Sequence, residues 1–225
     1  MRAWPSDASV AHLIFTDHQH LPHPDELDEA VEHAERKGAR AIRTSAMFPN
    51  AAAIVLADGF EVIDRLALLS CDLSADLSAE LPLPRRAVRL GRLHPWHLTP
   101  CSRIDRNAFG LMWGNTATSL RDVRHATPSS YARVARTDDG IVGFAISGAA
   151  GVHGYLQRLA VDPTARRRGA GHDLVLDALE WMRRRGAATA LVNTGVTNEA
   201  ALTLYRSIGF RDLTDELVIA ERRLT

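Results

Sequence analysis

The chain has 225 residues, of which 46% are hydrophobic and 24% are charged, so it is long enough to bury a sizeable core. Its formal net charge is zero, which gives no general attraction to nucleic acid or to a membrane surface. Two cysteines, Cys71 and Cys101, are too few for a disulfide framework and are expected to be buried thiols. No apolar run approaches the roughly 20 residues of a membrane span, and the N-terminus lacks a signal-peptide core. We therefore expect a cytoplasmic protein with neither nucleic-acid nor membrane partners.

The first elements of the chain alternate strands with helices. Residues 12–17 predict a strand, and the helix after it carries acidic residues in its first turn and ends at Gly38. A strand at 41–44, a second helix that ends before Gly59 and a final strand follow. The apolar face of the first helix is formed by Leu27, Ala30, Val31 and Ala34.

A linker and then a second series of elements follow. Residues 76–86 contain two prolines and are typical of a linker. Residues 87–93 predict a strand, and two helices are expected at 96–110 and 118–126. An Asp-Asp-Gly turn inside residues 131–147 predicts a hairpin.

The C-terminal third has the most regular pattern. Residues 154–161 predict a strand that must stop at Pro163, because proline cannot donate to a sheet ladder. The remaining predicted elements are a helix at 171–185, a strand at 189–194, a helix at 199–208 and two short strands within 210–224. This order predicts an α/β (α+β) fold, with helices packed on a mixed sheet.

An internal repeat links the two ends of the chain. Four N-terminal residues precede matching C-terminal residues by a constant offset: Ala51, Ile54, Gly59 and Phe60 correspond to Ala201, Leu204, Gly209 and Phe210. We interpret residues 1–75 as a decayed half-copy of the C-terminal unit. The alternative is chance similarity between two ordinary α/β units.

A basic, glycine-containing loop lies between the strand that ends at Val161 and the following helix. It reads Arg166-Arg167-Arg168-Gly169-Ala170-Gly171-His172. Glycines allow the backbone to approach a ligand closely, and the N–H groups at a helix N-terminus can bind pyrophosphate oxygens. Taken alone, the loop could equally be a basic surface turn.

The sequence around this loop resembles the GCN5-related N-acetyltransferase superfamily. The first matching motif is Leu159-Ala160-Val161-Asp162-Pro163 followed by Arg166-x-x-Gly169-x-Gly171. The second is Asn198-x-x-Ala201-x-x-Leu204-Tyr205 followed by Gly209-Phe210. The resemblance covers roughly residues 87–225, and it implies a mostly antiparallel mixed sheet that splays apart where acetyl-CoA enters.

The resemblance implies roles for individual residues. The backbone of Leu159, Ala160 and Val161 would pair with the pantetheine arm of acetyl-CoA. The loop would hold the pyrophosphate through Arg166, Arg167, Arg168, Gly169, Ala170, Gly171 and His172. Asn198 would contact the cofactor arm, and Tyr205 would protonate the departing thiolate. The alternative for Tyr205 is packing between a helix and the sheet.

The sequence does not identify a general base. The strand before the loop offers His153, Tyr155 and Gln157 but no acidic residue, so a base acting through water stays an alternative. A histidine-rich stretch, His12, His18, His20 and His23, has no spacing typical of a closed metal site, and we predict no metal. By resemblance, the acceptor would bind residues 96–130.

We therefore predict three regions: a half-domain without a cofactor site at 1–75, a linker at 76–86 and a catalytic domain at 87–225. The predicted activity is transfer of an acetyl group from acetyl-CoA to a primary amine of a small molecule or a peptide N-terminus. The alternative is a non-catalytic module that binds acetyl-CoA or a partner protein. The sequence is compatible with a homodimer.

Overall fold

A computed structural model describes residues 2–15, 21, 23–74, 82, 84–85 and 88–224. The chain divides into two compact units. Unit 1 comprises residues 1–68, 193–198 and 213–225, and unit 2 comprises residues 69–192 and 199–212. This division differs from the three ranges expected from the sequence, since two C-terminal segments group with the N-terminal residues. Most of the expected linker, residues 76–86, lies outside the described residues.

Unit 2 is built on a mixed sheet whose strand order is β4–β9–β8–β7–β6–β5. Strands β5, β6, β7 and β8 pair antiparallel with their neighbours in this series, whereas β8 and β9 are parallel. The strands are β5 (Arg89–Arg92), β6 (Ser129–Thr137), β7 (Gly140–Ala150), β8 (His153–Val161) and β9 (Thr189–Gly195), with the end of β4 (Glu61–Asp72) beside β9.

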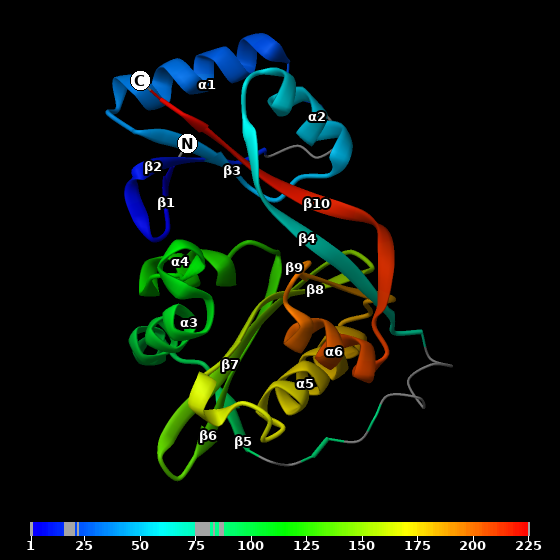
Figure 1. Cartoon of the computed structure of the whole chain (residues 1–225). Helices are drawn as coiled ribbons and strands as arrows, with labels where there is room; N and C mark the ends of the chain where they lie inside the picture. Colours follow the sequence, from blue (N-terminus) through cyan, green and yellow to red (C-terminus); the bar gives the residue numbers. More distant parts are fainter. Residues whose placement is uncertain are drawn as a thin grey trace. The chain divides into compact units, whose positions relative to one another are not determined.

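Helices cover both faces of the unit 2 sheet (Figure 1). Helices α3 (Leu98–Trp113) and α4 (Ala117–Arg124) lie on one face, and α5 (Ala170–Arg184) and α6 (Glu199–Ile208) lie on the other. A short 3-10 helix, Pro95–His97, leads into α3, and another, Pro163–Ala165, follows β8. Phe144 and Ile146 of β7 are fully buried against α3 and α4, together with Leu120. Burial of these apolar side chains stabilises the packing of α3 and α4 on β7.

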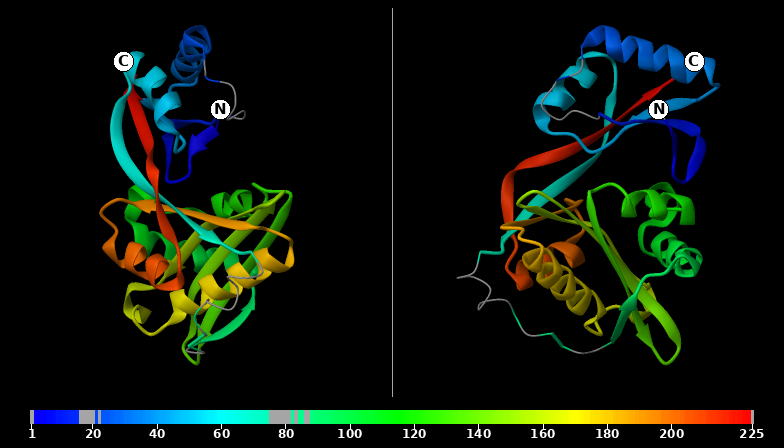
Figure 2. Two further views of the ribbon diagram at one scale, coloured as in Figure 1. Left: turned by 90° about the vertical axis from the view of Figure 1, so that its right-hand side faces the viewer. Right: turned by 180° about the vertical axis from the view of Figure 1, so that it is seen from behind.

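Among the described residues, the strands of unit 1 follow the order β1–β2–β3–β10–β4, and two helices accompany them. Figure 2 shows the molecule from two further sides. Its elements are β1 (Arg2–Trp4), β2 (Asp7–Leu13), α1 (Pro24–Arg36), β3 (Ala41–Thr44), α2 (Pro49–Ala57), β4 and β10 (Arg211–Arg223). Strands β2 and β3 are parallel, as β8 and β9 are in unit 2. Both units therefore contain a parallel strand–helix–strand arrangement.

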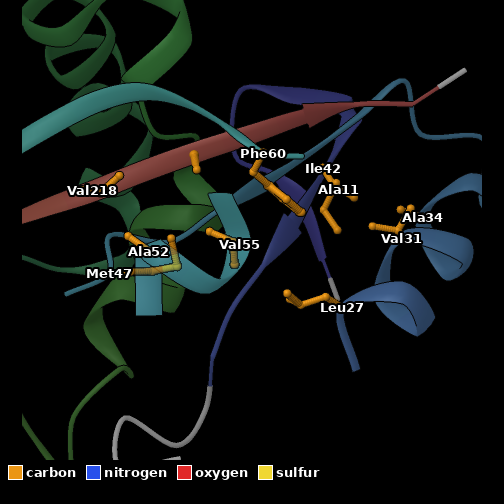
Figure 3. Packing of buried hydrophobic residues seen from close by; sticks show 11 residues of the cluster. Ala11, Leu27, Val31, Ala34, Ile42, Met47, Ala52, Val55, Phe60 and Val218 are labelled. Carbon is orange, nitrogen blue, oxygen red and sulfur yellow. The ribbon is translucent and has the colours of Figure 1, made fainter. Parts of the chain in front are cut away.

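Helices α1 and α2 pack on one face of the unit 1 sheet, around the apolar cluster shown in Figure 3. Leu27 and Val31 of α1 meet Val55 of α2 and Ile42 of β3 in this cluster. The cluster also includes Ala11, Ala34, Met47, Ala52, Phe60, Val218 and Ala220. Val218 and Ala220 come from the far end of the chain, so the core of unit 1 cannot form from the N-terminal residues alone.

Strands β4 and β10 are each divided between the two units. Residues 213–223 of β10 lie in unit 1, where β10 pairs antiparallel with β3. Residues 69–72 of β4 lie in unit 2, and the backbone N–H of Leu73 donates to the carbonyl of Ala188 there, at 2.8 Å. Each unit thus contains strand residues from both the N-terminal and the C-terminal part of the chain.

The structure confirms most predicted elements and corrects three. The region 210–224 contains the single strand β10 and not two short strands, so that prediction was wrong. The first predicted strand, 12–17, is replaced by β2 at Asp7–Leu13, and residues 16–17 lie outside the described residues. Strand β1 had no counterpart in the prediction, because three residues are too few to show a period.

His12 of β2 gives unit 1 a testable pH dependence. Its Nε2 lies 3.0 Å from the hydroxyl of Ser45. Burial, reinforced by the positive charges of Arg2 and Arg43, lowers the pKa of His12 from 6.5 to about 4. Between pH 6.5 and about 4, His12 is therefore protonated in the unfolded chain and neutral in the folded chain.

We expect the free energy of unfolding to decrease as the pH falls from 6.5 toward 4, and this contribution to be absent above 6.5. His12→Gln should remove that part of the slope. Urea denaturation at several pH values checks this, with His153→Gln on the exposed start of β8 as a control. Identical slopes for the wild type and His12→Gln would contradict it.

Candidate functional site

The loop between β8 and α5 has an unusual backbone. Arg167 has a φ of 61° and Gly169 a φ of 85°, both in the left-handed region. Arg167 is the non-glycine residue with positive φ among the described residues. Alternating left- and right-handed residues turn successive N–H groups toward one point, which is a common way to bind an anion. The side chains of Arg166, Arg167 and Arg168 are exposed around this loop.

The N-terminus of α5 has no cap from its own side chains. Gly169 is the N-cap residue, and the first helical hydrogen bond runs from Asp173 N–H to the Gly169 carbonyl at 3.0 Å. Helix geometry leaves the N–H groups of Ala170, Gly171 and His172 without intrahelical partners. Their dipoles add positive potential to that of the arginines. The end of α5 is therefore suited to hold the phosphates of a nucleotide-like ligand.

Gly171 lies where α5, α6 and β8 come together. A Cβ atom added there would stand 3.2 Å from Cδ2 of Leu204 and 3.7 Å from Cγ2 of Val161. The side chain of any larger residue at 171 would project into the space between these elements. A substitution at Gly171 therefore tests whether a ligand occupies that space.

Strand β8 separates from β9 beside the loop. Within the described residues, the β8–β9 ladder joins only His153, Gly154 and Tyr155 to residues 189–191. From Leu156 to Val161 the edge of β8 that faces β9 has no such ladder, although β7 still pairs with the other edge. An extended ligand could bond to that open edge as an additional strand would.

A β-bulge marks the start of the open edge. Ile146 pairs with Arg158 and Ser147 with Leu156, so Gln157 is the extra residue. The Oε1 atom of Gln157 is buried and has no hydrogen-bond partner among the described residues. Bulges re-aim side chains, and here the bulge lies at the place where β8 leaves β9.

Tyr205 is buried on α6, with 5% of its surface exposed. Its ring lies 5.6 Å from that of Phe210, tilted by 54°. Burial raises the pKa of Tyr205, and the positive charge of Arg158 opposes this shift. The phenol is therefore fully protonated near neutral pH and can act as a proton donor.

The predicted site residues lie at the end of β8, in the loop after it, at the start of α5, and before and on α6. Leu159, Ala160 and Val161 end β8, with Ala160 buried and the other two partly exposed. The loop and the start of α5 follow directly. Asn198 comes immediately before α6, and its side-chain amide donates to the hydroxyl of Thr194 at 3.0 Å. Of the candidate bases, His153 lies at the end of β8 opposite the loop.

The sequence analysis missed a buried ion pair between α3 and β8. Asp105 is completely buried, and both of its carboxylate oxygens accept hydrogen bonds from Arg158 at 2.7 Å. The sequence signal for this pair was Arg158, a charged residue between Leu156 and Leu159 in a predicted strand. Its partner could not be identified, because the two residues are 53 positions apart in the sequence.

The remaining cysteines and histidines show no second site. Burial raises the pKa of the Cys71 thiol to about 11 and that of Cys101 to about 12, so neither is an activated nucleophile. No group of three or more potential metal ligands occurs among the described residues, which exclude His18 and His20. The part of the chain that the structure describes has no helix long and apolar enough to cross a membrane.

The class of the protein follows from its fold and from two comparisons with solved structures. The tandem GNAT protein from the clavulanic acid biosynthesis pathway matches with a TM-score of 0.67 at 16% identity, over 88% of this chain and 69% of that chain. A GCN5-related N-acetyltransferase from Kribbella flavida matches with a TM-score of 0.65 at 17% identity, over 94% and 81%. At such low identities, the TM-scores show a shared fold and nothing more. The predicted GNAT fold is confirmed.

The chain belongs to the acetyltransferase (GNAT) family, whose family model matches residues 98–210. It is 35% identical over 77 residues to the [ribosomal protein bS18]-alanine N-acetyltransferase of Salmonella typhimurium, covering 34% of this chain and 52% of that protein. It is 40% identical over 57 residues to N-alpha-acetyltransferase 30 of Xenopus laevis, covering 25% and 21%. The chain thus spans about half the length, or less, of the curated relatives it matches.

Proposed function

We propose that the protein transfers the acetyl group of acetyl-CoA to a primary amine. The observation that carries the proposal is the uncapped N-terminus of α5, preceded by the left-handed Arg167 and Gly169 and flanked by the open edge of β8. Acetyl-CoA has a pyrophosphate, an extended arm rich in amides and a thioester. These three parts fit the helix end, the strand edge and the neighbourhood of Tyr205 in that order.

Each predicted residue has a role in this proposal. The N–H groups from Arg166 to His172 and the arginine side chains hold the pyrophosphate. The backbone of Leu159, Ala160 and Val161 pairs with the pantetheine arm, and Asn198 contacts the same arm. When the amine attacks the thioester carbonyl, the carbon–sulfur bond breaks and the thiolate takes its proton from Tyr205. The amine loses its proton to water or to a protein base.

The named relatives guide the choice of acceptor. One acts on an alanine of a ribosomal protein and the other carries an N-alpha-acetyltransferase name. We propose a primary amine of a peptide N-terminus or of a small molecule as the acceptor. Release of free thiol from acetyl-CoA should be measured against a panel of peptide N-termini, aminoglycosides and simple amines. Binding of acetyl-CoA without turnover of any amine would instead favour the non-catalytic alternative.

We further propose that residues 1–75 are a decayed half-copy with no cofactor site. At the N-terminus of α1, the side chain of His23 accepts from the N–H of Asp25, and the Glu26 side chain accepts from the N–H of His23. Thus the protein's own side chains occupy that helix end, whereas the end of α5 is open. The preceding sequence, residues 17–24, has no glycine, and most of it lies outside the described residues.

Titration of the full chain with acetyl-CoA is therefore expected to give one molecule bound per chain. Calorimetry measures this stoichiometry directly. The full chain is required, because removal of residues 1–75 would also remove the part of β4 that belongs to unit 2. A stoichiometry near two would show that residues 1–75 have kept a cofactor site.

A further inference from the structure

Arg158 lies at the junction between the strand edge and helix α3. It follows the bulged residue Gln157 on β8 and directly precedes Leu159. Its side chain points to the face of the sheet that carries α3, where it is 19% exposed and meets the fully buried Asp105. Its guanidinium also lies 3.8 Å from the ring centroid of Phe109. A buried arginine held on one side by a carboxylate and on another by an aromatic ring has a fixed position.

The same guanidinium contacts the end of α3. One nitrogen of Arg158 donates to the carbonyl oxygen of Trp113 at 2.8 Å. Asp105, in turn, accepts from the backbone N–H of Asn115 at 2.6 Å. Residues 110–116, which we call the α3–α4 segment, are therefore attached to β8 through one ion pair.

The first residues of the α3–α4 segment are kinked and exposed. Gly110 has a φ of 75°, which interrupts the helix and turns the segment away from its axis. Leu111 is 80% exposed and Met112 is 44% exposed, so neither side chain anchors the segment by burial. A short kinked segment with exposed apolar side chains depends on its polar anchors for order.

Helix α3 also contacts the loop at residues 166–172. A side-chain nitrogen of Arg166 reaches the carbonyl of Ala108 in α3 at 3.4 Å. The end of α3 is therefore connected both to the loop and to the strand whose open edge would hold the arm of acetyl-CoA. An amine that attacks the thioester must arrive beside that strand, on a side that the cofactor arm does not fill.

We propose that Arg158 is a positioning residue that, paired with Asp105, fixes the α3–α4 segment against β8 as the wall of the acceptor site. This inference rests on the proposed acetyltransferase function. A wall that becomes mobile binds the acceptor less well in the ground state and the transition state alike, which raises the KM with a smaller change in kcat. Loss of Arg158 should therefore affect the acceptor far more than acetyl-CoA.

The test compares Arg158→Met with Arg133→Met. Arg133 of β6 forms a similar partly buried pair with Asp177 of α5, at 3.2 Å, on the opposite face of the same sheet. For Arg158→Met we expect the KM for the acceptor to rise about 10- to 100-fold, with a smaller change in kcat. The dissociation constant of acetyl-CoA should change by less than about twofold, since no contact assigned to the cofactor is removed.

Hydrogen exchange provides a second readout that needs no activity. Amides of residues 110–116 should exchange at least about tenfold faster in Arg158→Met than in the wild type, because the anchor of the segment is gone. They should stay unchanged in Arg133→Met. Arg158→Lys keeps the charge but cannot bond Asp105 and the Trp113 carbonyl together, so we expect an intermediate KM and a folded protein.

The outcomes separate this inference from the proposed function. An acceptor KM in Arg158→Lys and Arg158→Met equal to that of the wild type would overturn the inference while leaving the acetyltransferase intact. Unchanged exchange at residues 110–116 would overturn it even if no amine were acetylated. A wild type that acetylates no amine refutes the proposed function alone, and the exchange result then decides whether Arg158 anchors the segment.

Discussion

Gly171→Glu is expected to abolish binding of acetyl-CoA while leaving the fold intact. Gly171 lies in the first turn of α5 with an ordinary helical φ, so the backbone accepts another residue. The new Cβ would meet only Cδ2 of Leu204, at 3.2 Å, and that flexible side chain can move. The carboxylate, however, would enter the space between α5, α6 and β8 where the proposed pyrophosphate lies.

Two effects act in the same direction in this variant. The side chain fills volume that the cofactor needs, and its negative charge repels the phosphates. The negative charge also neutralises the positive potential that the end of α5 and the arginines of the loop create for an anion. We expect the affinity for acetyl-CoA to fall by at least about 100-fold, since a new clash and a like charge near a buried ligand are each costly.

Calorimetry and the far-UV circular dichroism spectrum together check this expectation. Gly91→Glu is the matched control, because Gly91 lies on β5 and an added Cβ there meets nothing closer than 3.8 Å. Gly91→Glu should bind acetyl-CoA like the wild type. Normal affinity in Gly171→Glu would remove the loop from the cofactor site.

The sequence predicted the helices and strands whose signals lie within short, continuous stretches of the chain. Strand β8, helix α5 and strand β9 follow one another within 43 residues of local signals, from His153 to Gly195, and all three were expected. The division of β4 and β10 between the two units was not, because strand pairing between residues far apart leaves no local mark on the sequence. A continuous 13-residue strand at 211–223 was likewise split into two, since its exposed first half lacks a hydrophobic pattern.

The same distinction applies to the site. The loop at 166–172 and Tyr205 lie in compact motifs, so their residues could be named in advance. Arg158 could not, because its partner Asp105 comes from another element and the pair is meaningful only in three dimensions. The opening between β8 and β9 was implied by the resemblance and not by the residues, since spacing does not reveal where a parallel ladder stops.

Tyr205→Phe is expected to lower kcat by about 10²- to 10⁴-fold, the usual contribution of a general acid, with the lower figure applying if water replaces the phenol. The ring that packs on Phe210 stays, so cofactor affinity and folding should hardly change. Tyr131→Phe is the matched control. Tyr131 is partly buried and its ring stacks on that of Trp181, 5.0 Å away, but it lies on β6, away from the proposed thiolate. Single-turnover rates should be measured, so that product release does not mask the chemical step.

A change of leaving group distinguishes an acid from a packing residue. Burial raises the pKa of Tyr205, so the phenol keeps its proton until the departing sulfur becomes more basic than it was in the thioester. A more acidic thiol needs this proton less. With an acetyl donor whose leaving thiol is more acidic than that of CoA, the rate of Tyr205→Phe should therefore come closer to the rate of the wild type. If the ratio of the wild-type rate to the Tyr205→Phe rate is the same with both donors, Tyr205 orients α6 and gives no proton to the sulfur.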